Sequence, residues 1–246
     1  MKRRFAEITI TPSSFSKEEF KNMLNTASFL GFKVVGFNIH VKNFKNIPEV
    51  KNYAEKLGLE LVSRVDVTFS DIGLIKKYLK KYRKKVELIS IKGFSRKIIS
   101  FGCRDRRIDI IRVDPHYKFT LFKGDVKQIL EQDKAIEITA KPLIYAKNFQ
   151  ERVRTLQSYE KTLKTILKKR IKFVFGSGAC SPAEMRDARS LASLLVSFFD
   201  MDYAKALDSL SCNVMSIVER NRLKLSPNFI WPGVYLLEEE KYEGKI

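Results

Sequence analysis

Several side chains that could do chemistry stand at the ends of short apolar runs in this sequence. Asp66, Asp114 and Glu137 lie in or directly after such runs, and the two histidines, His40 and His116, follow others. Carboxylates and imidazoles brought together by a fold can ligate a metal ion or transfer protons. Such a site would make the protein a metal-dependent phosphoesterase or endonuclease. Because the chain has only two histidines and no HxH or HxxxH pair, this enzyme is the alternative interpretation.

A glycine-rich turn is a second place where the sequence could bind a ligand. The segment 176–179, Gly-Ser-Gly-Ala, follows an apolar run and precedes Ser-Pro-Ala-Glu at 181–184, which predicts the start of a helix. Free backbone N–H groups at such a turn bind anions, so Ser177 and Gly178 are candidates for phosphate contact. A plain strand-to-helix turn fits the same residues. Other polar candidates at the ends of apolar runs are Thr11, Asn38, Thr68, Lys92 and Lys141.

Basic residues exceed acidic ones by a wide margin. The chain has 47 Lys and Arg against 28 Asp and Glu among 246 residues, a formal net charge of +19. This surplus attracts polyanions and indicates a nucleic-acid partner, with an anionic membrane surface as the weaker alternative. No RNP, KH or zinc-finger pattern is present, so phosphate contacts without base reading are expected. The main basic clusters are 2–4, 76–85, 104–107, 164–172 and 220–224.

Cysteine usage and the N-terminal segment indicate the compartment. Cys103, Cys180 and Cys212 are an odd number without a CxxC pair, so neither a disulfide framework nor a cysteine zinc site is expected. The segment MKRRFAEITI lacks the apolar core of a signal peptide, and no run of about 18 apolar residues could span a bilayer. We therefore expect a cytoplasmic protein with no membrane partner.

The hydrophobic pattern predicts the elements that must position these residues. Apolar or β-branched runs begin near residues 5, 32, 59, 86, 108, 135 and 172, and the first four are spaced 27 residues apart. Helix-period segments fill nearly every gap between them. Alternating β and α segments predict parallel strands with crossover helices. The expected fold is therefore α/β, a TIM-barrel-like (β/α) barrel with functional groups at the carboxyl ends of its strands.

The barrel is expected to be irregular. Seven strands are clear, and an eighth could come only from the segment after Ser226, whose two prolines suit a central strand poorly. A doubly wound open sheet is the alternative, although the turn TPSSFS after the first run lacks the glycine-rich signature of that fold. No linker interrupts the chain. Residues 1–237 are therefore predicted to form one domain, followed by an acidic C-terminal tail at 238–246.

Capping residues predict where several helices begin. Ser16 and Glu19 have the spacing of a capping box, and Asn46 and Asp71 open two further segments with helical periodicity. A long segment from Phe149 onward carries an apolar stripe at helical spacing, which predicts another helix.

The C-terminal half carries a series of short motifs. In chain order they are Ser177, Gly178 and Ala179 at a strand end; Met185 and Arg186; Ala204, Ala206 and Leu207; and Arg220 with Asn221. Upstream, Asp114 and Glu137 mark two further strand ends. Over about residues 86–225, these motifs resemble the ribonuclease P protein component 3 family of archaea and eukaryotes.

This resemblance implies a TIM-barrel-like subunit that assists a catalytic RNA in removing the 5′ leader of precursor tRNA. The implied partners are ribonuclease P RNA, precursor tRNA held through the holoenzyme, a Pop-five-like subunit in a heterotetramer, and other small basic proteins of the holoenzyme. Related barrels are phosphoesterases of the polymerase and histidinol phosphatase type, with HxH on the first strand, where this chain has Glu7, Ile8 and Thr9. The resemblance thus implies no catalytic residue, metal or cofactor in this chain, and the Mg²⁺ of the holoenzyme is expected on its RNA.

Basic residues are the candidate RNA- or partner-binding groups under this interpretation. Those in the best-matching segment are Arg186, Arg189, Arg220, Arg222 and Lys224, and those in strand-end loops are His116, Lys123 and Lys141. Large apolar residues in the C-terminal helices indicate either core or a subunit interface, namely Leu194, Leu195, Phe198 and Phe199. A general RNA-binding protein outside any ribonucleoprotein is a third alternative.

Overall fold

The computed structural model describes residues 3–14, 16–38, 47–231 and 234–236. Its main sheet contains parallel strands that pair in chain order, so each strand lies beside its neighbours in the sequence. These strands are β1 (Ala6–Ile10), β2 (Val34–Asn38), β3 (Glu60–Val67), β4 (Leu88–Gly93), β5 (Ile110–Val113), β6 (Ala135–Thr139) and β7 (Lys172–Gly176). Every apolar run singled out in the sequence forms one of them. The expected α/β barrel with seven clear strands is confirmed.

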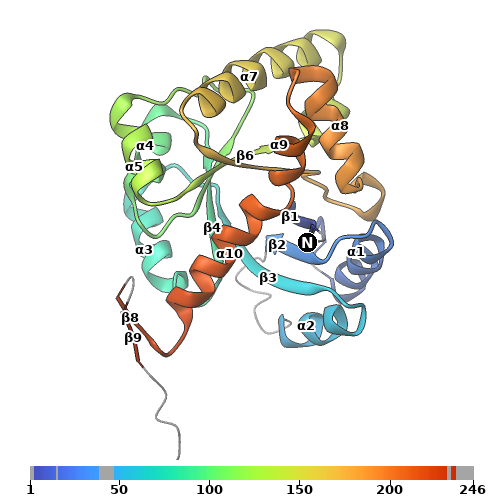
Figure 1. Cartoon of the computed structure of the whole chain (residues 1–246), viewed down its shortest axis with the longest axis vertical. Helices are drawn as coiled ribbons and strands as arrows, with labels where there is room; N and C mark the ends of the chain where they lie inside the picture. Colours follow the sequence, from blue (N-terminus) through green and yellow to red (C-terminus); the bar gives the residue numbers. More distant parts are fainter. Residues whose placement is uncertain (1–2, 15, 39–46, 232–233, 237–246) are drawn as a thin grey trace, which may run out of the picture.

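Helices surround the strands on the outside (Figure 1). They are α1 (Lys17–Phe29), α2 (Ile47–Lys56), α3 (Ile72–Tyr82), α4 (Arg96–Arg104), α5 (Lys123–Glu131), α6 (Lys141–Ile144), α7 (Phe149–Lys168), α8 (Ala188–Phe199), α9 (Tyr203–Asp208) and α10 (Cys212–Leu225). Their apolar faces form one core with the outward-facing strand residues, for example Leu79 and Ile99 against Phe37, Ile89 and Ile111. In the ranges that the structure describes, no helix is long and apolar enough to cross a membrane.

Isolated hydrogen bonds, rather than a strand ladder, join the ends of β7 and β1. Backbone pairing runs from β1 to β7 and, within the described residues, does not continue from β7 back to β1. Across this seam the Thr11 N–H donates to the Ala179 carbonyl at 2.9 Å, and the Ser177 N–H donates to the Glu7 carboxylate at 2.8 Å. Gly176 allows β7 to approach the Glu7 side chain of β1 this closely, because any Cβ atom at position 176 would lie only 2.7 Å from Glu7 Oε1 and would clash with it. The barrel is therefore irregular at this seam, as the sequence predicted.

Helix α10 lies across the amino-terminal end of the strands (Figure 1). Its Val214 and Ile217 pack against the first inward-facing strand residues, such as Ala6 and Val62. Just before α10, the Leu210 carbonyl accepts a hydrogen bond from the Ala6 N–H at 2.8 Å. This helix therefore seals one end of the barrel interior.

Capping side chains start several helices where the sequence predicts. Ser16 accepts a hydrogen bond from the Glu19 N–H at 3.1 Å, and Asp71 accepts one from the Leu74 N–H at 2.6 Å. Helix α7 begins at Phe149, as expected. Asn46 lies outside the described residues.

The predicted helix start at 181–184 is wrong. Pro182–Glu184 form only a short 3-10 turn, and α8 begins at Ala188, where Asp187 accepts from the Ser190 N–H at 3.0 Å. Ser181 makes no capping hydrogen bond and the backbone becomes extended at Met185, so the turn does not continue into a helix, while the Glu184 carboxylate accepts from the Cys180 N–H at 2.7 Å.

The segment after Ser226 does not supply an eighth barrel strand. It forms a separate antiparallel pair, β8 (Phe229–Trp231) and β9 (Val234–Tyr235), beyond the end of α10 (Figure 1). The predicted acidic tail at 238–246 lies outside the described residues, and its separation from a domain at 1–237 stays a prediction.

Candidate functional site

A buried ion cluster fills the middle of the barrel. The Arg64 guanidinium on β3 makes a two-pronged pair with Glu137 on β6, through contacts of 2.5 and 2.8 Å. Its Nε donates to Asp66 at 2.7 Å, and its other N–H groups donate to the Ile8 carbonyl at 2.8 Å and the Ser90 hydroxyl at 3.0 Å. The Arg64 and Glu137 side chains are completely buried. All five donors of this guanidinium are therefore satisfied inside the barrel.

The cluster holds the Asp66 carboxylate in the charged form. Burial by itself would raise the pKa of Asp66, but Arg64 and Arg112 attract the carboxylate and lower its pKa to about 2. Arg112 contributes through a contact of 2.9 Å to Asp66. Burial would likewise lower the pKa of Arg64, whereas Asp66 and Glu137 raise it above its ordinary value. The two carboxylates are thus neutralised by arginines of the same chain.

The residues of the phosphoesterase alternative do not form a common site. Asp66 and Glu137 bind Arg64, while Asp114 pairs with Lys92 at 2.6 Å. The His116 side chain is 62% exposed, and its Nε2 lies 3.8 Å from the Glu151 carboxylate. His40 lies outside the described residues. Within the described ranges, no three His, Cys, Asp or Glu side chains gather closely enough to hold a metal ion.

The expected phosphate turn is occupied by side chains of the chain itself. The Ser177 N–H donates to Glu7 at 2.8 Å, and the Gly178 N–H donates to the Thr9 hydroxyl at 2.8 Å. Gly178 has a φ of +68°, which favours glycine at this point of the turn. Ser177 is buried, and its hydroxyl accepts from the Ala179 N–H at 3.1 Å. Glu7 therefore supplies the anion that the free N–H groups were expected to attract.

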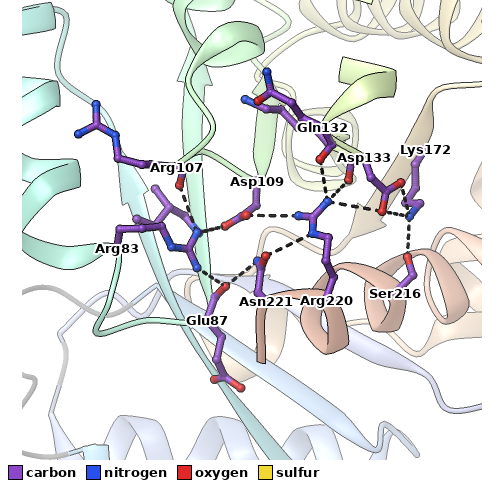
Figure 2. Close-up of polar contacts among 12 residues, drawn as sticks. Arg83, Glu87, Arg107, Asp109, Gln132, Asp133, Lys172, Ser216, Arg220 and Asn221 are labelled. Carbon is purple, nitrogen blue, oxygen red and sulfur yellow. Dashed lines mark hydrogen bonds and ion pairs between the residues drawn. The ribbon is translucent and has the colours of Figure 1, made fainter. Parts of the chain in front are cut away.

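Arg220 and Asn221 tie α10 to the loops before the strands (Figure 2). Arg220 donates to the Gln132 carbonyl at 2.9 Å and pairs with Asp109 at 3.3 Å. Asn221 is buried and donates to the Glu87 carbonyl at 2.8 Å. The family-type Arg-Asn pair thus has a structural role within the chain.

Arg189 and Arg222 line a groove at the amino-terminal end of the barrel. Arg222 pairs with Glu87 at 2.5 Å and with Glu60, whereas Arg189 is exposed on the first turn of α8. Lys224 is exposed on the last turn of α10. The groove has a volume of about 1770 Å³ and runs past the starts of β1, β2, β3 and β4.

The other predicted contact residues lie in the segments that follow the carboxyl ends of the strands. Lys141 pairs with Glu184 at 2.7 Å, and Lys123 is exposed at the start of α5. Arg186 is half-buried and donates to the carbonyls of Ala183 and Met185 at 2.8 and 2.7 Å. The structure thus divides the predicted residues between the two ends of the barrel, and their roles stay predictions.

Sequence reasoning missed Arg64 and Arg112, the residues that organise the interior. Each interrupts an apolar run that forms a strand, in ELVSRVDV and IIRV. A charge inside such a run needs an opposite charge elsewhere in the interior, and Glu137 in AIEIT provides one across the barrel from Arg64. Charged residues of opposite sign inside otherwise apolar runs were therefore the signal in the sequence that could have indicated this buried cluster.

Comparison with known proteins identifies the family. A family model described as RNase P subunit p30 matches residues 4–226. The chain belongs to this family. Ribonuclease P protein component 3 of Methanothermobacter thermautotrophicus is 26% identical to it over 232 residues, covering 88% of this chain and 89% of that protein. The protein of the same name from Methanococcus vannielii is 25% identical over 199 residues, covering 78% and 82%.

Solved structures agree with the p30 fold. One chain of the cryo-EM structure of archaeal ribonuclease P with mature tRNA matches this p30-family chain with a TM-score of 0.79 at 22% identity. The match covers 96% of this chain and 99% of that chain. The resemblance inferred from motifs in residues 86–225 is therefore confirmed, and the family match extends to the N-terminal strands.

Proposed function

We propose that this chain is a non-catalytic protein subunit of ribonuclease P, assisting a catalytic RNA in removing the 5′ leader of precursor tRNA. The observation that carries the proposal is the family match over residues 4–226. The formal net charge of +19 supports an RNA partner, because cations offset the repulsion between RNA phosphates.

The ion cluster around Arg64 supports a subunit without a hydrolytic centre of its own. In TIM-barrel enzymes the reacting groups lie at the carboxyl ends of the strands. Here Asp66 and Glu137 are already paired with arginines, and the buried Asp114 is paired with Lys92. The independent phosphoesterase is therefore not favoured, and Mg²⁺ is assigned to the RNA of the holoenzyme.

The proposed partners are ribonuclease P RNA, precursor tRNA through the holoenzyme, a Pop-five-like subunit in a heterotetramer and other small basic subunits. Among the apolar residues considered for the protein interface, Leu195 is buried in the core, while Phe198 is 51% exposed. Phe198 is thus the most exposed member of that set, while Leu194 and Phe199 are half-buried. Cytoplasmic localisation is part of the same proposal.

Purification of the native complex from the source cells tests this function. We expect one structured RNA and several small basic proteins, and the complex should cleave the 5′ leader of precursor tRNA. RNA of mixed identity would instead indicate general RNA binding. A protein free of nucleic acid that hydrolyses phosphoesters with Mn²⁺ or Zn²⁺, and loses this activity on His116→Ala, would overturn the proposal.

A further inference from the structure

The groove at the amino-terminal end of the barrel combines an apolar floor with a basic rim. Its floor includes Phe5, Leu59 and Val86, and the ring of Tyr203, which is 46% exposed, lines it from α9. The lining contains eight Lys or Arg residues and four Asp or Glu residues. It is a much larger depression than the pocket of about 350 Å³ beside His116.

Most acidic groups of the groove are already engaged within the chain. Glu60 pairs with Arg4 and Arg222, and Glu87 pairs with Arg222 at 2.5 Å. Asp187 accepts hydrogen bonds from the first turn of α8. Glu60 and Glu87 therefore pair with two arginines of the groove, which leaves six Lys or Arg residues beside Glu55 and Asp187 in its lining.

The remaining cations of the rim are exposed and come from separate elements. Lys33 precedes β2, Lys51 lies on α2, Lys84 and Lys85 precede β4, and Arg189 lies on α8. In the portion of the chain that the structure describes, none of the five has an ion-pair partner. Cations distributed along a groove, rather than gathered at one point, match a ligand whose negative charges repeat along its length.

We propose that this groove binds the phosphate backbone of an unpaired RNA segment. The inference rests on the proposed function, which makes RNA the partner, and adds where the RNA lies. A cationic groove tracks the backbone, while apolar and aromatic side chains accept bases by stacking, and this combination is typical of sites for single-stranded nucleic acid. The RNA thus lies at the end of the barrel opposite the one where barrel enzymes place their active sites.

The same positions define the experiment. The triple variant Lys33→Gln/Lys84→Gln/Lys85→Gln removes three unpaired charges from the groove. A matched control, Lys97→Gln/Lys118→Gln/Lys147→Gln, removes three exposed lysines that follow β4, β5 and β6. Binding of the full-length proteins to labelled ribonuclease P RNA from the source cells is measured between 0.05 and 0.5 M KCl. Both triple variants carry the same net charge, so a difference between them reports location.

The groove variant is expected to bind the RNA about tenfold or more weakly at low salt, and its slope of log affinity against log salt should fall by about 2. The control should stay within about twofold of the unmodified protein. Equal losses in both variants would overturn the inference while leaving the proposed function intact. Loss of a protein subunit from the reconstituted holoenzyme, with RNA affinity retained, would also overturn it and assign the groove to an acidic protein segment. Failure of the unmodified protein to bind the RNA would contradict the proposed function itself.

Discussion

At the scale of single residues, the most consequential feature is a buried arginine surrounded by acceptors. Arg64 binds Glu137, Asp66, Ser90 and the Ile8 carbonyl, and its side chain has no exposed surface. A buried pair of this kind adds little when compared with a well-packed apolar core. Removing one partner, however, leaves a charge buried without compensation.

Arg64→Met is therefore expected to lower the free energy of unfolding by about 3–5 kcal/mol. Urea denaturation followed by circular dichroism measures the change. The double variant Arg64→Met/Glu137→Gln should be more stable than Arg64→Met, because the orphaned carboxylate is then neutral. A loss below about 1 kcal/mol in the single variant would show that the cluster is not needed to hold the barrel together.

Lys134 makes stability depend on pH. It is buried and donates to the carbonyls of Gly102 and Asp105 at 2.7 and 2.6 Å. Burial lowers the pKa of Lys134 from 10.5 to about 8. Between these values the unfolded chain holds a proton that the folded chain has lost, so stability rises with pH.

The contribution of Lys134 to unfolding free energy should rise by about 1 kcal/mol from pH 8 to pH 9. The measurement compares the unmodified protein with Lys134→Met by urea denaturation at both pH values, since the difference cancels other titrating groups. Burial raises the pKa of neighbouring Cys103 to about 12, and that group titrates in both proteins. Parallel pH profiles for the two proteins would contradict the prediction.

At the scale of elements, the close contact between β1 and β7 requires a residue without a side chain, Gly176. A Cβ atom at Gly176 would lie 2.6 Å from Thr9 Cγ2 and 2.7 Å from Glu7 Oε1. The Thr9 hydroxyl and the Glu7 carboxylate each accept a hydrogen bond from the 177–178 backbone, so neither side chain can move away without disturbing one.

Gly176→Ala should therefore destabilise the protein by about 2 kcal/mol or more, in the range of overpacked cores. Gly124→Ala is the matched control, because a Cβ atom there meets nothing within 4 Å on α5. That control should leave the melting temperature unchanged or slightly raised, since alanine suits a helix better than glycine. Equal behaviour of the two variants would mean that the seam adjusts freely.

The start of α8 is also an element-scale feature. Asp187 accepts from the N–H groups of Arg189 and Ser190, whereas Ser181 makes no capping bond. Asp187→Ala should cost about 1 kcal/mol of stability, as loss of an N-cap does, and Ser181→Ala should cost nothing measurable. Thermal unfolding of the two variants distinguishes them. A larger loss for Ser181→Ala than for Asp187→Ala would contradict the assignment of Asp187 as the stabilising cap.

At the scale of the whole molecule, the net positive charge and the ion pairs have opposite effects on stability, and salt weakens them to different degrees. The formal net charge of +19 produces repulsion within the folded protein, while the strongest ion pairs are buried and poorly screened by salt. Exposed ion pairs contribute little to stability. Salt should therefore relieve the repulsion more than it weakens the pairs.

We expect the melting temperature to rise by a few degrees, corresponding to about 1 kcal/mol, as KCl increases from 0.01 to 0.2 M. Calorimetry in a buffer without phosphate measures this rise without specific anion binding. A falling melting temperature would show that exposed ion pairs outweigh the repulsion.

The sequence by itself determined the strands, the order of α and β elements and the basic character of this protein. These depend on local periodicity and composition, as in the evenly spaced runs that became β1, β2, β3 and β4. The series of motifs over about residues 86–225, which includes Arg220 and Asn221, also indicated the family.

Only the tertiary structure decided which of these residues are available to a partner. Arg220 pairs with Asp109 and donates to nearby carbonyls. The N–H groups of the 176–179 turn donate to Glu7 and Thr9, and Glu137 pairs with Arg64. Each pairing joins residues far apart in the chain, so no local pattern reveals it. The groove likewise exists only because the starts of successive strands meet beside α10. Residue type sets what a side chain can bind, and the fold decides whether that capacity is used inside the molecule or left at its surface.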